Sequence, residues 1–482
     1  MNAALIIDIV YIIIVALVCL RIIYDTESSA KTLAYVLLAI FIPVAGIGFY
    51  FVFGINYRKR LIYSKKLVKD EVKLKELNTR IISYSARNLK KCALEVGDSR
   101  SLVNLLMNDN LSPLTDGNSV KVLINGEQKF PEVLDALSKA EHHIHLEYYI
   151  YEDDIIGNQI KEILIQKAKQ GVEVRFIYDD FGSRSIRKKV VKELKNAGVE
   201  AYPFNRVRLL LFANRINYRN HRKIIIVDGN CGFVGGINIS DRYINKQDEP
   251  DKLYWRDTHL RIDGPGILNL QHTFLCDWNF CSNQSVQLDG LYYDQIRYDS
   301  DVSVQIAAGG PDSPASTIML SFLKAISLAK NEILLTTPYF VPGESIINAI
   351  KVAVMGGVHV KILVPGISDS YWVNAAAWSN YDELLKAGVE IYIYKKGFIH
   401  AKTMVIDKHM SILGTANMDH RSFELNFEVN AIVYARDFAE QLCGFFENDI
   451  QQAEKLNLED VISKPVFRHL SERIGRLLSP LL

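Results

Sequence analysis

Two apolar stretches near the amino end stand out in the pattern of hydrophobic and polar positions. Residues 33–55 contain no charged side chain. A helix of that length, rising about 1.5 Å per residue, can cross the ~30 Å hydrocarbon layer of a bilayer. The other stretch runs from about residue 4 to residue 24, with Asp8 close to its start. A short polar segment joins them, so residues 1–57 are predicted to form a hairpin of two transmembrane helices.

Two other interpretations of this region stay open. A cleaved signal peptide needs a positively charged amino end, and residues 1–7 contain no Lys or Arg. A single span beside a buried core helix is the second. Both are less favoured than the hairpin, because the two apolar stretches are alike and only a short polar segment separates them.

Behind this region the chain alternates helical and strand patterns, and it does so twice. Each copy holds a helix end running into a buried strand, then a glycine-led strand, then a helix closing on glycine before another strand. The matching segments are 136–151 and 325–340, 171–178 and 357–364, and 194–200 and 385–390. Strands alternating with helices predict α/β layers around a largely buried sheet, and two copies predict two similar lobes.

The same pattern predicts the domain boundaries. The lobes are expected at residues 119–290 and 300–482, because the segment between them is polar and weakly periodic. Residues 58–118 are predicted to be a basic helical connector. The last segment, 464–482, places five apolar residues on one helical face, namely Phe467, Leu470, Ile474, Leu477 and Leu481. Packing of this segment against the second lobe is the favoured interpretation, and contact with a membrane surface is the alternative.

Charge is balanced overall and uneven along the chain. Lys and Arg number 56 against 55 Asp and Glu, a net charge of +1, so total charge gives no argument for nucleic-acid binding. Residues 56–91 nevertheless carry a net charge of +9, which leaves about −7 for everything behind them. By the positive-inside rule, this basic stretch and the lobes behind it are expected in the cytoplasm, next to an anionic leaflet.

Composition narrows the class of protein further. The chain is 49% hydrophobic and 23% charged, which excludes a disordered protein and allows large cores. Its six cysteines include no CxxC pair, so they are expected to be reduced thiols and not a disulfide framework.

A five-residue pattern closes each copy of the repeat. Histidine, lysine, aspartate, glycine and asparagine stand at offsets 0, 2, 7, 14 and 17 in both copies. The two sets are His221, Lys223, Asp228, Gly235 and Asn238, and His400, Lys402, Asp407, Gly414 and Asn417. Residues two apart in a strand point to the same face, so each histidine is expected to project together with its lysine. If the lobes face each other, both sets converge.

Such a convergence suits a phosphodiester. Two ammonium groups and two amides can hold its non-bridging oxygens. One neutral imidazole can attack phosphorus, while the other, protonated, gives a proton to the leaving alcohol. Opposite protonation states need different surroundings, and Asp257 and Glu428, each at the start of a later strand, are candidate carboxylates behind the histidines. Asp228 and Asp407 stand at strand ends, where a mainly structural role is expected.

The H-x-K-x4-D pattern followed by G-G/T-x-N resembles the two half-sites of the phospholipase D superfamily. Further segments are similar to the bacterial cardiolipin synthase family, namely the double span with Pro43 and Gly54, Trp255 to Asp257, Asp277 with Trp278, Thr337 to Phe340, and Arg421 to Glu428. The resemblance implies two fused phospholipase D-like lobes with α/β/α layers and a mixed sheet. It also implies one active site between the lobes, no metal and no cofactor.

The resemblance also implies an activity, with roles for the residues. Two phosphatidylglycerol molecules would give cardiolipin and glycerol through a covalent phosphatidyl-histidine. His221 would be the nucleophile and His400 the acid and base. Lys223, Lys402, Asn238 and Asn417 would bind the phosphate, Asp257 and Glu428 would orient the histidines, and Asp228 and Asp407 complete the catalytic motifs. One departure is Gly236, where the second copy has Thr415, so a hydroxyl contact to phosphate is in doubt in the first half-site.

The resemblance further implies a multi-pass protein of the bacterial inner membrane, with cytoplasmic lobes and anionic lipids as partners. Other functions stay open. A membrane-bound phospholipase D would resolve the same intermediate with water. A phosphodiesterase or nuclease is disfavoured by the apolar amino end and the −7 charge. A non-catalytic lipid-binding protein is the third alternative. A phosphatidylethanolamine substrate and the oligomeric state stay undetermined.

Overall fold

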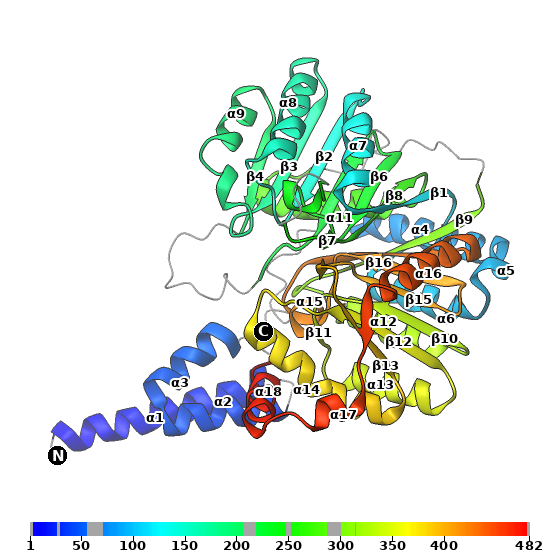
Figure 1. The fold of residues 1–482 in the computed structure, drawn as a ribbon. Coiled ribbons are helices and arrows are strands. Elements are labelled where there is room, and N and C mark those ends of the chain that lie inside the picture. Colours follow the sequence, from blue (N-terminus) through cyan, green and yellow to red (C-terminus); the bar gives the residue numbers. More distant parts are fainter. Residues whose placement is uncertain are drawn as a thin grey trace.

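The computed structural model describes residues 3–26, 29–54, 71–205, 218–246, 252–286, 300–313 and 315–479. Within these residues, one mixed sheet of fifteen strands runs through the molecule, with helices on its faces. Figure 1 shows the two halves of this sheet stacked one above the other, with the amino-terminal helices projecting to one side. The α/β class predicted from the alternating pattern is confirmed.

The first half of the sheet holds seven strands in the order β1-β8-β6-β5-β2-β3-β4. The strands β2, β3 and β4 are parallel, and the other neighbours are antiparallel. Their bounds are β1 Thr115–Ile124, β2 His143–Tyr148, β3 Glu173–Asp179, β4 Glu200–Phe204, β5 Lys223–Val227, β6 Cys231–Gly235 and β8 Thr258–Asp263. The helices of this half are α7 Asn125–Ser138, α8 Ile155–Lys169, α9 Val190–Asn196 and α11 Ile267–Ser282.

The second half repeats this order as β9-β18-β16-β15-β10-β12-β13, with β19 added at the outer edge. The bounds are β9 Val302–Gly309, β10 Glu332–Thr336, β12 His359–Pro365, β13 Glu390–Tyr394, β15 Thr403–Ile406, β16 Met410–Gly414, β18 Glu428–Tyr434 and β19 Ala453–Lys455. Its main helices are α12 Thr317–Leu328, α13 Glu344–Met355, α14 Tyr371–Ala387 and α16 Arg436–Ile450. The halves join where β1 pairs antiparallel with β9.

The core lies in three layers, as the period of two in a strand requires. Ile225 and Val227 of β5 pack in a cluster with α7, α8 and α9. Ile224 and Ile226 face the other way, into a central cluster that contains α11 and α16 and strands of both halves. The helices α12, α13 and α14 cover the outer face of the second half. Because the central cluster is shared, the two halves are packed against each other around α11 and α16.

Two short parallel pairs lie outside the large sheet. The strand β7 (Trp255–Arg256) pairs with β14 (Phe398–Ile399), and β11 (Phe340–Val341) pairs with β17 (Met418–Asp419). The pair β7–β14 joins one half to the other. The remaining helices are α4 Glu71–Lys91, α5 Ala93–Val96, α6 Arg100–Asn110, α15 His420–Glu424, α17 Leu458–Ile462 and α18 Val466–Leu478. Residues 55–70, with half of the predicted basic stretch, lie outside the described residues.

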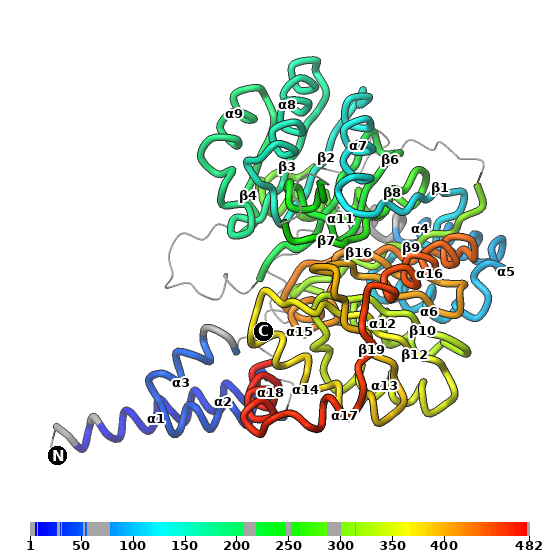
Figure 2. The backbone as a smooth tube through the Cα atoms, in the orientation of Figure 1, coloured from blue at the N-terminus to red at the C-terminus, as the bar shows by residue number. Residues whose placement is uncertain are grey.

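The amino-terminal segment forms three helices instead of two, namely α1 (Ala3–Asp25), α2 (Ser29–Phe41) and α3 (Pro43–Phe49). Pro43 lacks an N–H group, so the second apolar stretch breaks there and restarts with proline in its first turn. Figure 2 shows the chain turning back after α1 and again after α2. Tyr50 Oη donates to Asp25 Oδ2 over 3.1 Å, which joins the end of this segment to the end of α1. Among the described residues, no helix is both long and apolar enough to cross a membrane.

Candidate active site

Each motif histidine follows a segment that is paired with the opposite half of the molecule. The N–H of His221 donates to Phe427 O over 2.9 Å, and the N–H of Phe427 donates to Arg219 O over 2.9 Å. In the second motif, the N–H of His400 donates to Arg256 O over 2.7 Å. The residues that follow Phe427 and Arg256 are Glu428 and Asp257. Backbone pairing alone therefore brings each predicted carboxylate next to the histidine of the other half.

The side chains complete this crossed arrangement. His221 Nδ1 lies 2.9 and 3.0 Å from the two carboxylate oxygens of Glu428. His400 Nδ1 lies 2.7 Å from Asp257 Oδ2. Both carboxylates are completely buried. The sequence pointed to these two carboxylates without assigning either to a histidine, and the structure pairs them across the halves. With Nδ1 engaged, the Nε2 atom of each ring is the one available to a substrate.

The two carboxylates are held in different ways. Thr415 Oγ1 donates to Glu428 Oε2 over 2.5 Å, and Asn426 Nδ2 donates to Glu428 Oε1 over 3.3 Å. At the matching position of the first motif, a Cβ on Gly236 would stand 2.1 Å from Asp257 Oδ1. The shorter aspartate thus occupies the space that a side chain at position 236 would need. This contact explains why the first motif has no hydroxyl there.

Each lysine lies beside the histidine of its own motif, as predicted. Lys223 Nζ donates to His221 O over 2.8 Å, and Lys402 Nζ donates to His400 O over 2.5 Å. The strand β5 begins at Lys223 and β15 begins after Lys402, so neither histidine belongs to a strand. The histidines stand just before the strands from whose edges they were predicted to project. Each lysine folds back onto the carbonyl of its own histidine.

The two motif asparagines line the same cavity, but their side-chain amides differ in hydrogen bonding. Asn238 Oδ1 accepts from the N–H of Ile150 over 3.2 Å, and its Nδ2 donates to Tyr243 Oη over 2.7 Å. Asn417 Oδ1 is buried and has no hydrogen-bond partner among the described residues. The amide of Asn417 is therefore the one with spare capacity for a ligand.

Asp228 and Asp407 lie at the far ends of their strands and do not line the cavity. Asp228 accepts the N–H groups of residues 141, 142 and 143, each over 2.8 Å. Asp407 accepts those of residues 330, 331 and 332 over 2.7–2.8 Å. Both adopt a φ of +52°. Their carboxylates fix the turns that lead into β2 and β10, which agrees with the structural role expected of them.

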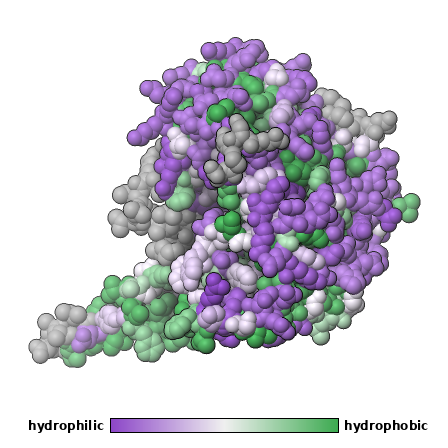
Figure 3. All heavy atoms as spheres, in the orientation of Figure 1, coloured by the Kyte–Doolittle hydropathy of each residue, from purple (hydrophilic) through white to green (hydrophobic). Residues whose placement is uncertain are grey.

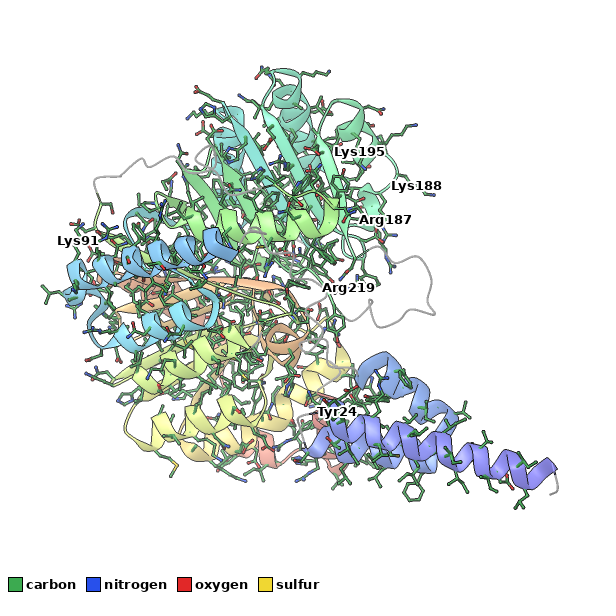
Figure 4. The ribbon with its side chains drawn as sticks, turned by 180° about the vertical axis from the view of Figure 1, so that it is seen from behind. Tyr24, Lys91, Arg187, Lys188, Lys195 and Arg219 are labelled. Carbon is green, nitrogen blue, oxygen red and sulfur yellow. The ribbon has the colours of Figure 1, made fainter. Side chains whose placement is uncertain are left out.

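Residues of the candidate site line one cavity of about 400 Å³. His221, His400, Asn238 and Asn417 all line it. Further polar groups there lie outside the two five-residue motifs, namely Arg219, Arg242, Tyr339, Asp369, Arg421 and Asn426. Tyr339 belongs to the segment Thr337 to Phe340, which the family resemblance had marked. Arg421 and Asn426 belong to a segment that the family resemblance had marked, whereas no pattern marked Arg219, two residues before His221. Figure 4 shows Arg219 where the first half of the molecule faces the second.

Burial and neighbouring charges set the ionisation of the site. Burial lowers the pKa of His221 to about 4, against the attraction of Glu428. Burial and the charge of Lys402 lower the pKa of His400 to about 3. Burial also lowers the pKa of Lys223 to about 7 and that of Lys402 to about 8. The histidines are thus neutral at pH 7 in the empty site, and an anion among them would favour their protonated forms.

Comparison with known proteins gives the family. A family model described as "Cardiolipin synthase, PLD-like domain" matches residues 133–255 and 322–450. The cardiolipin synthase of Geobacillus sp. (strain WCH70) is 41% identical over 462 residues, which cover 95% of this chain and 90% of that protein. Major cardiolipin synthase ClsA of Bacillus subtilis (strain 168) is 37% identical over 490 residues, which cover 100% and 99%. This chain belongs to the cardiolipin synthase family.

The two family matches hold one motif histidine each, His221 in the first and His400 in the second. A solved structure supports the same fold for this cardiolipin synthase family member. The phosphatidylserine synthase of Haemophilus influenzae Rd KW20 superposes with a TM-score of 0.58 at 14% identity, covering 79% of this chain and 100% of that one. Two copies of one fold, fused in a single chain, therefore supply one histidine each to a shared cavity.

Proposed function

We propose that this cardiolipin synthase family member transfers a phosphatidyl group from one phosphatidylglycerol to another, giving cardiolipin and glycerol. The observation that carries the proposal is the crossed pairing of His221 with Glu428 and of His400 with Asp257 at one cavity. Two imidazoles, each with its Nδ1 on a carboxylate, supply a nucleophile and a separate proton carrier. The relatives' names as cardiolipin synthases support the choice of product.

In the first step, His221 Nε2 attacks the phosphorus of a bound phosphatidylglycerol. A nitrogen–phosphorus bond forms, the bond from phosphorus to the glycerol oxygen breaks, and protonated His400 gives its Nε2 proton to that oxygen. Glycerol leaves. In the second step, a hydroxyl of another phosphatidylglycerol attacks the phosphatidyl-histidine while His400 takes its proton. The nitrogen–phosphorus bond breaks, cardiolipin forms and both histidines return to their starting states.

The other motif residues stabilise charge during both steps. We assign Lys223, Lys402, Asn238 and Asn417 to the non-bridging phosphate oxygens, where negative charge develops. Asp257 and Glu428 stabilise each imidazolium when it forms. His221 and Lys223 hold the pKa of Glu428 below its ordinary value, although burial alone acts to raise it. Glu428 is therefore a carboxylate when His221 becomes positively charged.

We also propose that the apolar segment formed by α1, α2 and α3 inserts into the inner membrane. Large apolar side chains are exposed along α1 and α2, among them Ile12, Leu17, Leu20 and Leu33. Figure 3 shows these helices as a hydrophobic projection from an otherwise hydrophilic body. The Lys and Arg excess of residues 56–91 supports a cytoplasmic position for the catalytic halves.

The activity is tested with purified protein in phosphatidylglycerol vesicles without divalent metal. Mass spectrometry should find cardiolipin with an equal amount of glycerol. The H221A and H400A variants should lose at least about 10³-fold in rate, as expected when a nucleophile or its proton carrier is removed. Phosphatidic acid in place of cardiolipin would show that water resolves the intermediate. Undiminished turnover in either variant would contradict the mechanism.

A further inference from the structure

The last helix, α18, turns its apolar face away from the protein. Val466, Phe467 and Leu477 are 80–85% exposed, and Leu470 and Ile474 are exposed as well. The predicted packing of this segment against the second lobe is confirmed, but the contact is made by the opposite face of α18. Leu481 of the predicted apolar face lies outside the described residues. Five exposed large apolar residues on one helical face need a partner that is not part of the folded chain.

The opposite face of α18 fixes this orientation. Glu472, Gly475 and Ser479 are buried against the second half. A Cβ on Gly475 would stand 2.7 Å from the backbone nitrogen of Ala376, so α18 lies directly on the backbone of α14. Lys464 Nζ also donates to Glu472 Oε1 over 2.7 Å. The helix is thus packed on the protein through its small and polar residues, which leaves the apolar side outward.

Basic residues follow one edge of the outward face. At about 100° per residue, His469, Arg473 and Arg476 fall along the same edge of the apolar arc. Both arginines are exposed, and Arg476 reaches only a partly exposed Glu383, 3.9 Å away. An apolar arc bordered by arginines is the pattern of helices that lie in the interface of an anionic membrane.

A second group of exposed apolar side chains lies beside the catalytic cavity. Ile367, Tyr371 and Trp372, around the start of α14, are exposed. Their neighbours Ser370 and Val373 line the cavity. Tyrosine and tryptophan are the side chains that favour the headgroup level of a bilayer. A surface that held these residues at the headgroups would therefore hold the cavity mouth there too.

We propose that the outward face of α18, with the start of α14, docks on an anionic lipid bilayer and presents the cavity to its headgroups. Figure 1 places α18 at the same end of the molecule as α1, α2 and α3. Lys31 of α2 pairs with Glu424 of α15 over 2.8 Å, close to the site residues Asp419 and Arg421. The choice of anionic lipid rests on the proposed function. A second copy of the chain is disfavoured, because twofold pairing through this face would bring like-charged arginines together.

The contact is tested with an environment-sensitive fluorescent amino acid, incorporated in the full-length chain at position 467. On vesicles that contain phosphatidylglycerol, its emission should shift to the blue and be quenched by lipids brominated along the acyl chain. The matched control is position 94, because Leu94 is equally exposed on α5; a probe there should show neither change. A probe at 467 that stays in water on vesicles would overturn the proposal. Burial at 467 in a lipid-free dimer would also overturn it, in favour of a second copy.

A functional test separates docking from chemistry. The triple variant F467S/L470S/L477S should lose turnover on vesicles by about tenfold or more, and keep it on a short-chain phosphatidylglycerol dissolved as monomers. Replacing Arg473 and Arg476 by glutamine should weaken binding to anionic vesicles by about fivefold per arginine and leave neutral vesicles unaffected. Either product, cardiolipin or phosphatidic acid, serves as the readout, so failure of the proposed function leaves this test intact. Equal loss on both substrates would reject docking.

Discussion

Gly236 and Thr415 stand at matching positions of the two motifs, and each determines how the nearby carboxylate is held. Thr415 adds a hydroxyl that binds Glu428, whereas Gly236 leaves its space to Asp257. A one-methylene difference between the carboxylates is thus matched by the presence or absence of a side chain beside them. Two residues must change together to convert one half-site into the other.

This pairing predicts that even a methyl group at position 236 is harmful. In G236A, the new Cβ would displace Asp257 from its contact with His400, and turnover should fall by about 10²-fold, the effect of a misplacement of about 1 Å. The measurement is cardiolipin formation on vesicles, with circular dichroism to verify folding. The matched control is T415S, which keeps the hydroxyl and should keep most activity. Full activity in G236A would show that Asp257 does not need its present position.

The lowered pKa values of the histidines imply that substrate binding is coupled to the uptake of a proton. With a pKa of about 3, His400 is neutral at pH 7 in the empty site, and the mechanism needs it protonated when substrate is bound. A bound phosphodiester anion stabilises the imidazolium and raises that pKa, so binding should take up about one proton near pH 7. Calorimetry in buffers of different ionisation enthalpy measures this uptake. The H400N variant should bind without it, and uptake that persists there would assign the proton elsewhere.

At the scale of elements, the motif aspartates act on turns. Asp228 and Asp407 each gather three backbone N–H groups at the entrance of a strand, with a φ of +52°. The pattern of five offsets marked them together with the catalytic residues, although they stand at the other end of the strand. One motif therefore contains residues at the cavity and residues that fix a turn at the other end of the strand.

D228A should destabilise the protein by about 1–3 kcal/mol, because three N–H groups lose their acceptor. D228N keeps part of the acceptor and tolerates the positive φ, so it should lose less. Denaturant unfolding measures both. Turnover per folded molecule should stay within about twofold of the unsubstituted chain, and a large loss of turnover without a loss of stability would show a catalytic role.

The sequence predicted the α/β class, the twofold repeat and the family. It also pointed to two carboxylates that the structure places on the histidines. What it missed depends on contacts distant in the chain. The crossing of Glu428 to His221 arises from the pairing of residues 219–221 with Phe427, which no local pattern encodes. Pro43 was present in the sequence, but its break between α2 and α3 was not predicted. The catalytic roles of the motif residues stay predictions.

For the whole molecule, one buried arginine behind the site ties the halves together. Arg222, between the first motif's histidine and lysine, pairs with Asp277 of the central helix α11. Its guanidinium also donates to Gly309 O over 3.2 Å and to Glu428 O over 3.3 Å, both in the second half. The matching residue of the second motif is Ala401, so this tie exists once. It fixes the strand that carries Glu428 relative to His221.

Removing Arg222 should strongly lower the stability of the folded protein. R222M leaves Asp277 buried without its cation, beside Glu147, whose pKa burial and Asp277 already raise, and should cost about 3–5 kcal/mol of stability. The double variant R222M/D277L removes both charges and should recover a large part of that loss. Thermal unfolding compares the two. A double variant no more stable than R222M would show that the loss comes from the hydrogen bonds of Arg222 to the second half and not from the unpaired charge of Asp277.

The crossed carboxylates also govern when the protein becomes active during its synthesis. The ribosome completes the first motif long before it synthesises Glu428. Until then His221 lacks its carboxylate partner, and the second half of the chain, which lines part of the cavity, is missing. A nascent chain that has not yet reached Glu428 is therefore expected to be inert toward lipids. Activity begins only when translation has passed β18 and the second copy has folded onto the first.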